Sequence, residues 1–260
     1  MISAWLRRGR TAELWLDGPA RAVFARKLPG AVPLDALPPL AEFDLVLCGS
    51  SGAADHERAV VRAARAAGVR SAVWLDHWVN YAARFDRLPD ELWVCDEPAA
   101  RIARETVPGP PVLVKGNPYL EDAAAEVRAL AGPRGERERV LYLTEPTSAV
   151  AAAATGDPLG WGYEERAALR GFLERVQGVE VRVRRHPAEP ADKYAELLAE
   201  FGVAASPGGP LAADIAWADT VAGCDTMGMV VALAAGRRVV SVIPPGGRPL
   251  SLPFAEIERL

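Results

Sequence analysis

The chain has 260 residues, half of them hydrophobic and a quarter charged, and these proportions exclude a disordered chain because so apolar a sequence can bury a substantial core. Its 30 Lys and Arg against 34 Asp and Glu give a net charge of −4. Without a basic surplus to displace counterions from phosphates, the chain is not expected to bind nucleic acid. The three cysteines are scattered, which predicts free thiols in a reducing compartment.

No apolar segment is long enough to suggest a membrane protein. No stretch of about 18 apolar residues is free of charges, so no segment is expected to span a membrane. The N-terminal sequence MISAWLRRGR lacks the uninterrupted apolar stretch of a signal peptide. We therefore expect a cytoplasmic protein.

Short apolar segments alternate with helical segments through the first half of the chain. Strands are expected at Glu13–Asp17, Asp44–Cys48, Ser71–Leu75, Glu91–Cys95 and Pro111–Val114. Helices are expected at Pro19–Lys27, Ala53–Ala67, Val79–Phe85, Pro98–Glu105 and Tyr119–Ala131. Strands that are almost wholly apolar are typical of a parallel sheet with helices on both faces.

A break at Ala131–Arg139, rich in Gly, Pro and charge, precedes a second series of alternating elements. Strands are expected at Val140–Leu143, Val179–Val183, Thr220–Gly223 and Arg238–Ile243, with a long loop at Thr144–Gly162. Helices are expected at Tyr163–Val176, Ala191–Phe201, Leu211–Trp217 and Thr226–Ala235. The pattern predicts an α/β fold with two Rossmann-like, doubly wound domains, residues 1–133 and 134–260, whose strand carboxyl ends face a shared cleft.

In the second half, one strand runs directly into Arg185 and His186, followed by Pro187. Both side chains are expected at the carboxyl edge of the sheet, where ligands bind in such folds. A guanidinium and an imidazole suit a phosphate-bearing ligand. The alternative is that the arginines form a solvated strand face and His186 caps the next helix.

The next strand is followed by Gly223, Cys224, Asp225 and Thr226. Gly223 permits close backbone approach, and the N–H groups at the start of the following helix attract phosphate. Asp225 would oppose an anion unless it caps the helix or binds a hydroxyl. The alternative is a plain capped helix start. Neither GxGxxG nor a Walker A sequence is present, which disfavours dinucleotide and P-loop binding.

The motifs of the second half, VLYLTEPTS, a strand ending in RRHP, and ADTVAGCDTMGMVVALAAGRRVVSVIPP, together resemble the donor domain of GT-B-type glycosyltransferases and related nucleotide-sugar enzymes. The HP dipeptide is similar to one in bacterial sialyltransferases and polysialyltransferases, where it helps to bind the nucleotide. RHP is also similar to a motif of the CDP-glycerol-using teichoic acid polymerases. ALAAGRRVVS resembles the phosphate-holding segment of this superfamily and of UDP-GlcNAc 2-epimerases.

The resemblance implies a role for each matched residue. Arg185 and His186 would contact the nucleotide phosphate or ribose, Asp225 and Thr226 would line the donor phosphates, and the amides near Cys224–Thr226 would stabilise the leaving phosphate. The residues that would face the cleft are Thr144, Thr147 and Ser148. The Glu pair of retaining enzymes, EX7E, is missing, since Asp225 and Ala232 occupy the comparable helix.

In the first half, Asp76 and His77 directly follow a strand. A general base that deprotonates an acceptor hydroxyl requires a carboxylate or imidazole at such a position. The alternative is that Asp76 caps a helix while His77 and Trp78 pack beneath a loop.

Further polar residues follow the other strands of the first half. Asp96 and Glu97 repeat the geometry of Asp76, but Pro98 makes a helix start an equal interpretation. Lys115 would reach an anionic group, and the loop Gly49–Gly52 would offer amides and hydroxyls to a sugar or form a tight turn. The three histidines and three cysteines have no metal-ligand spacing, so no metal site is expected.

These features together predict a metal-independent glycosyltransferase without a bound cofactor. A nucleotide-sugar donor would bind to the second half, and Asp76 or His77 would act as the base on an acceptor hydroxyl of a glycan or small molecule, with inversion. The resemblance favours a CMP- or CDP-linked sugar. The alternatives are a nucleotide-sugar epimerase or hydrolase on the same fold, and a non-catalytic GT-B-like binding protein.

Overall fold

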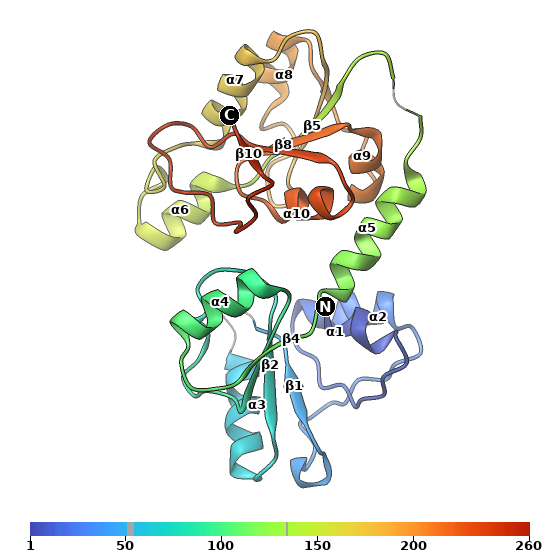
Figure 1. Ribbon diagram of the computed structural model, residues 1–260, viewed down its shortest axis with the longest axis vertical. Helices are drawn as coiled ribbons and strands as arrows, with labels where there is room; N and C mark the ends of the chain where they lie inside the picture. Colours follow the sequence, from blue (N-terminus) through green and yellow to red (C-terminus); the bar gives the residue numbers. More distant parts are fainter. Residues whose placement is uncertain (51–54, 134) are drawn as a thin grey trace. The chain divides into compact units, whose positions relative to one another are not determined.

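The computed structural model describes residues 1–50, 55–133 and 135–260 (Figure 1). The chain divides into two compact units, Met1–Tyr119 and Leu120–Leu260.

The first unit is built on a four-stranded parallel sheet with the strand order β1-β2-β3-β4. The strands are β1 (Val46–Cys48), β2 (Ser71–Leu75), β3 (Glu91–Val94) and β4 (Val112–Val114). All five residues of β2 are buried, as expected for a central strand covered on both faces. The carboxyl ends of β2 and β3 lie in register, with Leu75 opposite Val94, so the residues that follow them share one sheet edge.

Helices and aromatic side chains cover this sheet. The helical segments are α1 (Ile2–Leu6), α2 (Pro19–Lys27), η1 (Leu40–Glu42), α3 (Asp55–Ala66), η2 (Ala82–Arg84) and α4 (Glu97–Thr106). Trp5 of α1 packs edge-on against Trp74 and Trp93, which project from neighbouring strands on one face. Ala64 of α3 belongs to a separate buried cluster with Leu40 and Val69.

The second unit contains a six-stranded parallel sheet with the strand order β10-β9-β8-β5-β6-β7. The strands are β5 (Arg139–Leu143), β6 (Glu180–Arg184), β7 (Ala204–Ala205), β8 (Thr220–Gly223), β9 (Arg238–Ser241) and β10 (Glu258–Arg259). The chain proceeds outward from β5 to β7, then returns to the other side of β5 and proceeds to β10. This is the 3-2-1-4-5-6 order of the Rossmann fold, and its reversal lies between β5 and β8.

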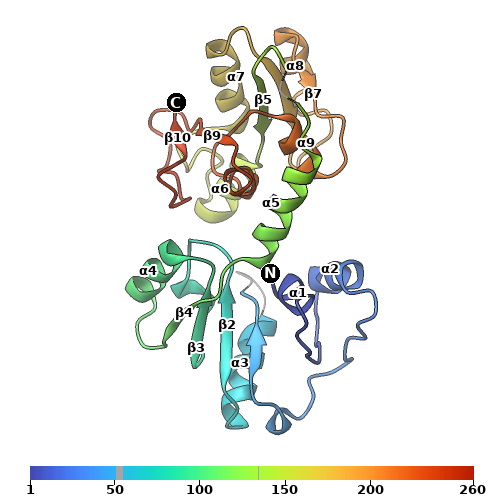
Figure 2. The same cartoon turned by 45° about the vertical axis from the view of Figure 1, so that its right-hand side comes forward.

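Helices cover both faces of the second sheet (Figures 1 and 2). The helices are α5 (Pro118–Leu130), α6 (Thr147–Thr155), α7 (Glu165–Arg175), α8 (Ala195–Phe201), α9 (Leu211–Trp217) and α10 (Met227–Ala234). Alternate strand residues such as Tyr142 and Val183 join α7 and α8 in one buried cluster. Leu143 points to the opposite face, because successive strand side chains alternate, and there it meets α10 at Gly228.

The two compact units divide at a different residue from the expected domain boundary, which stays a prediction. The break at Ala131–Arg139 was expected to separate residues 1–133 from 134–260, yet the division lies at Tyr119, near the start of α5. Ala124 and Val127, one turn apart on α5, are buried. Arg128 donates to the carbonyl of Ala234 at the end of α10 over 3.0 Å. A Gly/Pro-rich connection therefore joins two elements of one unit, and α5 belongs to the second.

Three expected elements differ from the structure. The expected strand Glu13–Asp17 forms only one bridge, between Trp15 and Leu34. The expected helix Val79–Phe85 is reduced to the 3-10 turn η2, preceded by Asn80 in the left-handed region at φ 59°. The expected loop Thr144–Gly162 contains α6, whose run of alanines favours helix.

The expected α/β fold class is confirmed by the two parallel sheets and their helices. Within the described ranges, the reversal of strand order occurs in the second sheet, whereas the first proceeds in sequential order. The cleft expected between the two halves stays a prediction. None of the helices in the described ranges combines the length and apolar character that a membrane span requires.

Candidate functional site

Three loops converge at the carboxyl edge of the second sheet. They follow β5, β6 and β8, and β5 lies between the other two strands. The His186 N–H donates to Thr144 Oγ1 over 2.9 Å, which joins the loop after β6 to the loop after β5. The Asp225 N–H donates to Glu145 Oε1 over 3.0 Å, which joins the loop after β8 to the same central loop. Hydrogen bonds therefore connect the loop after β5, where the strand order reverses, to the loops on both of its sides.

The His186 imidazole is held in one orientation by its own loop. The Ala188 N–H donates to His186 Nδ1 over 3.1 Å, so the neutral ring carries its proton on Nε2. In the part of the chain that the structure describes, Nε2 has no hydrogen-bond partner, and the residue is half-buried. His186 therefore presents an N–H donor at the sheet edge.

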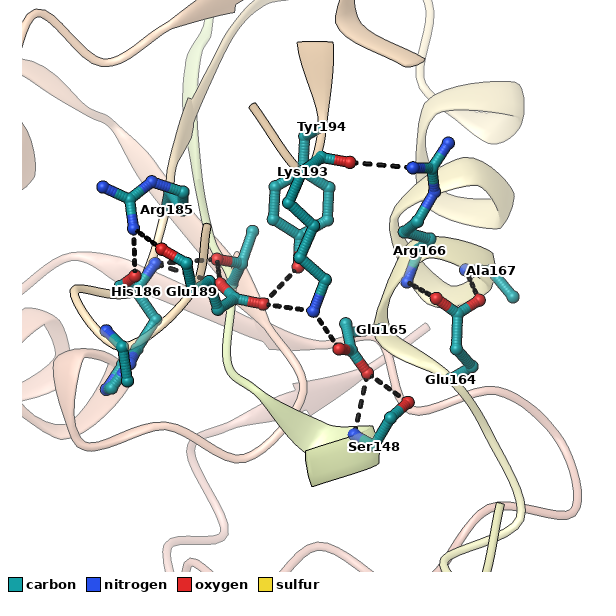
Figure 3. Close-up of polar contacts among 12 residues, drawn as sticks. Ser148, Glu164, Glu165, Arg166, Ala167, Arg185, His186, Glu189, Lys193 and Tyr194 are labelled. Carbon is teal, nitrogen blue, oxygen red and sulfur yellow. Dashed lines mark hydrogen bonds and ion pairs between the residues drawn. The ribbon is translucent and has the colours of Figure 1, made fainter. Parts of the chain in front are cut away.

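Glu189 is the buried anchor of the His186 loop (Figure 3). Its Oε2 accepts hydrogen bonds from Thr144 Oγ1 and from the His186 N–H, the latter over 3.1 Å. Its Oε1 accepts from Lys193 Nζ over 2.9 Å and from Tyr194 Oη over 2.6 Å. Burial raises the pKa of Glu189, but the hydrogen bonds from these partners outweigh burial and hold the pKa below its ordinary value.

Lys193 extends this network to the start of α6. Its Nζ pairs with Glu165 of α7 as well as with Glu189. Glu165 in turn accepts from the Ser148 N–H over 2.8 Å and from Ser148 Oγ over 2.6 Å (Figure 3). One lysine between two buried carboxylates therefore fixes both the His186 loop and the first turn of α6.

The Arg185 guanidinium stabilises its own loop by hydrogen bonds to backbone carbonyls. Its Nη1 donates to the carbonyl oxygens of His186, over 2.8 Å, and of Glu189 (Figure 3). These bonds close the turn after β6 and use part of the guanidinium. Its remaining N–H groups have no partner in the described ranges and are available to a ligand.

The first turn of α10 packs unusually close to β5. A Cβ on Gly228 would lie 2.5 Å from Leu143 Cδ1, and one on Gly223 would lie 3.0 Å from the Leu143 carbonyl oxygen. Thr226 is the N-cap of α10 but makes no side-chain capping bond. The Met229 N–H bonds to the Thr226 carbonyl over 3.0 Å, and within the described residues no N-cap side chain satisfies the N–H groups before it, at the positive end of the helix dipole.

The Asp225 carboxylate points to the loop after β9. It accepts hydrogen bonds from Arg248 Nη2 over 2.9 Å and from Ser251 Oγ over 2.9 Å, and its side chain has no exposed surface. The Arg248 guanidinium lies 3.4 Å from the ring centroid of Trp161. Asp225 therefore neither caps α10 nor is free to contact a ligand, and Arg248 offsets its charge.

Glu145, between these loops, was missed by sequence reasoning. Burial raises its pKa to about 7, and the Asp225 carboxylate adds to the rise. The Asp225 N–H, Arg248 and the Tyr163 hydroxyl oppose it only in part. A carboxyl that titrates near neutral pH at the strand-order reversal is suited to exchange protons.

The residues that the resemblance places toward the cleft lie deeper than expected. Thr144 and Thr147 are only 4% and 1% exposed, and Ser148 is half-buried and bonded to Glu165. Cys224 is buried beside Tyr142, and burial raises the pKa of its thiol to about 12. The Thr144 and Ser148 side chains support the loops, while His186 Nε2, Glu145 Oε2 and the amides of Thr226 and Met227 have no partner in the described ranges.

In the first unit, Asp76 and His77 follow β2 as half-buried residues. The Asp76 carboxylate accepts from Ser50 Oγ over 3.5 Å and lies 3.7 Å from Arg84 Nη1. Arg84 Nη1 also donates to Ser50 Oγ over 2.8 Å. Asp76 is thus held by a serine and an arginine rather than by a helix start. The remaining expected residues of this loop, Ser51 and Gly52, lie outside the described residues.

Asp96, after β3, has a structural role. It is the N-cap of α4 and accepts from the Ala99 N–H over 2.8 Å. It also accepts from the indole N–H of buried Trp78 over 3.0 Å. Lys115 Nζ lies 4.6 Å from the ring centroid of Trp93. The helix-start interpretation of Asp96 is confirmed.

Neither Glu189 nor Lys193 was identified from the sequence. The sequence holds one local signal, and it concerns Glu189. This residue follows His186 by three positions, within reach of the N–H groups of the same loop. Across residues 1–50, 55–133 and 135–260, no three His, Cys, Asp or Glu side chains come together as a metal site requires.

No protein-family model and no curated protein matches this chain. Among solved structures, Thermosulfurimonas dismutans KpsC, a beta Kdo 2,7 transferase, is similar over 96% of this chain and 83% of its own, with 14% identity and a TM-score of 0.40. A beta Kdo 2,4 transferase of KpsC from the same organism is similar over 74% and 73%, with 15% identity and a TM-score of 0.33. The wall teichoic acid polymerase TagF is similar over 62% of this chain and 38% of its own, with 12% identity and a TM-score of 0.32. Likenesses at this level of identity and TM-score carry no functional argument.

Proposed function

We propose that this protein is a metal-independent glycosyltransferase that binds a nucleotide-activated sugar at the carboxyl edge of its second sheet. The observation that carries the proposal is the His186 loop, fixed beside β5 with an N–H donor presented at the strand-order reversal. Ligands of such sheets bind outside the carboxyl ends of the strands at this reversal.

The chemistry of the site favours an anionic ligand. Among the residues that the structure describes, no acceptor is fixed to His186 Nε2, to the remaining N–H groups of Arg185 or to the uncapped start of α10. Asp225, the nearest carboxylate to α10 in sequence, is paired with Arg248 and does not oppose an anion. The resemblance of RRHP to nucleotide-binding motifs of sugar transferases supports a nucleotide phosphate as that ligand.

In the proposed reaction an acceptor hydroxyl attacks the anomeric carbon of the donor sugar, and the bond from that carbon to the phosphate oxygen breaks. The donors around His186 stabilise the charge that develops on the leaving phosphate. Asp76 or His77 takes the proton of the acceptor hydroxyl. Displacement from the opposite side inverts the anomeric carbon.

The proposal is tested by ligand binding. We expect CMP, CDP, UMP or UDP to raise the melting temperature, because a ligand that prefers the folded state stabilises it. His186→Ala should weaken binding of the best nucleotide by about 1–3 kcal/mol in calorimetry, the cost of a lost buried or charge-assisted hydrogen bond. Affinity unchanged in His186→Ala, with the fold intact, would reject the assignment.

His186→Asn is the matched control for the loop. The Asn amide oxygen can take the place of Nδ1 as acceptor for the Ala188 N–H, while the Nε2 donor is lost. This variant should keep the melting temperature of the wild type and lose affinity as His186→Ala does. Affinity retained in His186→Asn but lost in His186→Ala would show that the imidazole acts through the loop rather than on the ligand.

Two assays on the purified protein distinguish the alternative functions. Consumption of a nucleotide sugar without any acceptor would favour an epimerase or hydrolase. Absence of binding to every nucleotide of the panel would favour a non-catalytic protein of this fold.

A further inference from the structure

The Glu145 carboxyl occupies the junction between the first and fourth strands of the second sheet in chain order. It directly follows β5, and its Oε1 accepts from the Asp225 N–H at the end of β8 over 3.0 Å. The Tyr163 hydroxyl lies 3.5 Å from the same oxygen. Oε2 has no partner within the described residues. One oxygen thus fixes the side chain, and the other remains available at the position where a ligand binds in this fold.

A carboxylate at this position would repel a phosphate, whereas the neutral acid would donate a hydrogen bond to it. We propose that Glu145 binds the anionic ligand as the neutral acid, its Oε2–H donating to a phosphate oxygen, so that binding takes up a proton from solvent. This inference rests on the proposed function and adds a proton to its ligand-binding step. No covalent bond to the ligand forms or breaks in this step.

The groups around Glu145 leave it as the titrating member of its cluster. The Asp225 carboxylate, from the loop after β8, is paired with Arg248 from the loop after β9. Burial raises the pKa of the Cys224 thiol to about 12 and also raises those of the neighbouring phenols of Tyr142 and Tyr163. The thiol and the phenols therefore stay protonated across the neutral range.

The direction of the pH effect follows from this arrangement. With a pKa of about 7, Glu145 in the free protein is mostly neutral at pH 6 and mostly ionised at pH 8. A bound phosphate raises that pKa further, because like charge disfavours the ionised form. Proton uptake should therefore increase from pH 6 to pH 8, and the Kd should rise about tenfold over the same interval.

The experiment is calorimetry with the tightest-binding member of the nucleotide panel, at pH 6, 7 and 8, in paired buffers of different ionisation enthalpy. Glu145→Gln retains an acceptor for the Asp225 N–H and an NH₂ donor in place of Oε2–H, but cannot titrate. We expect wild type to take up protons and Glu145→Gln to lose that uptake, with a Kd that varies far less with pH. The proton uptake of Glu145→Gln is subtracted from that of the wild type, which removes any proton exchange by the nucleotide itself.

Glu180→Gln, an exposed change at the amino end of β6, is the matched control and should keep the uptake of wild type. Nucleotide binding without pH-dependent uptake in wild type would overturn the inference and leave the proposed function standing. Uptake that persists in Glu145→Gln would place the proton on another group, such as His186, and would also overturn it. Absence of nucleotide binding in every variant would reject the proposed function, and the inference with it.

Discussion

At the scale of single residues, two aspartates that follow neighbouring strands of the first unit have different surroundings. The Asp96 carboxylate accepts hydrogen bonds from the Ala99 N–H and from the indole N–H of Trp78. Asp76 contacts the side chains of Ser50 and Arg84, and nearly half of its own side chain is exposed to solvent. The same position at a sheet edge therefore gives one carboxylate a capping role and leaves the other partly exposed to solvent.

Asp76→Asn preserves the shape of the side chain and removes its basic oxygen. We expect turnover of a nucleotide sugar with a working acceptor to fall by roughly 10²–10⁴-fold, with nucleotide affinity nearly unchanged. The measurement compares Asp76→Asn with His77→Ala, since either residue is a candidate for the base. Near wild-type rates in both variants would place the base elsewhere.

Asp96→Ala is the structural control for this pair. Loss of an N-cap should lower the free energy of unfolding by about 0.5–2 kcal/mol while turnover by the folded protein persists. A selective loss of turnover in Asp96→Ala would contradict the capping role.

At the scale of elements, the first turn of α10 depends on the absence of a side chain at Gly228. Gly228→Ala would bring its Cβ to 2.5 Å from Leu143 Cδ1, inside a packed core. We expect a loss of about 1–3 kcal/mol in the free energy of unfolding, the usual cost of overpacking, together with weaker nucleotide binding because the start of α10 shifts.

Gly171→Ala is the matched control, because Gly171 also lies in a helix but a Cβ there meets nothing within 4 Å. This change should stabilise the protein by roughly 0.5–1 kcal/mol, since alanine has the higher helix propensity. Chemical denaturation measures both. Equal effects in the two variants would contradict the close packing of α10 on β5.

The helices and strands differ in how far the sequence predicts them. Buried strands such as Ser71–Leu75 are recognisable because their apolar runs end at Gly, Pro or charge. The expected strand at Glu13–Asp17 has the same local pattern but pairs only through Trp15, and pairing depends on distant residues. The helix expected at Val79–Phe85 does not form, because the backbone at Asn80 is left-handed. No local sequence pattern predicted this conformation.

The position of Arg185 and His186 at the sheet edge was predictable from the sequence, whereas the side chains that support their loop were not. RHP after a strand identified Arg185 and His186 directly. The raised pKa of Glu145 depends on burial and on Asp225, 80 residues further along the chain, so no local pattern contains it. The burial of Thr144 and Thr147 likewise follows from packing within the second unit.

At the scale of the whole molecule, the chain is two α/β units, and His186, Glu145 and α10 all belong to the second of them. The unit that holds this site begins near α5, well before the Gly/Pro-rich break that composition marks as a boundary. Val127 of α5 is fully buried, and such a side chain contributes about 1.5–3 kcal/mol.

A fragment of residues 118–260 should therefore unfold cooperatively and bind the panel nucleotide with an affinity close to that of the full chain. A fragment of residues 134–260, cut at the compositional break, should melt at a clearly lower temperature because it lacks α5. Thermal denaturation and calorimetry on both fragments provide the measurement. Equal stability of the two would show that α5 does not belong to the second unit.

The lysine held between two buried carboxylates also constrains how this sequence can diverge. Glu165 and Glu189 are each 5% exposed, and Lys193 compensates both. Removing one partner of a buried ion pair costs about 3–5 kcal/mol, a large share of the roughly 5–15 kcal/mol that stabilises a typical domain. Any single mutational step at these three positions should therefore be strongly disfavoured. Descendant sequences should either keep the whole triad or exchange it as a unit, so the three positions should co-vary across evolutionary lineages.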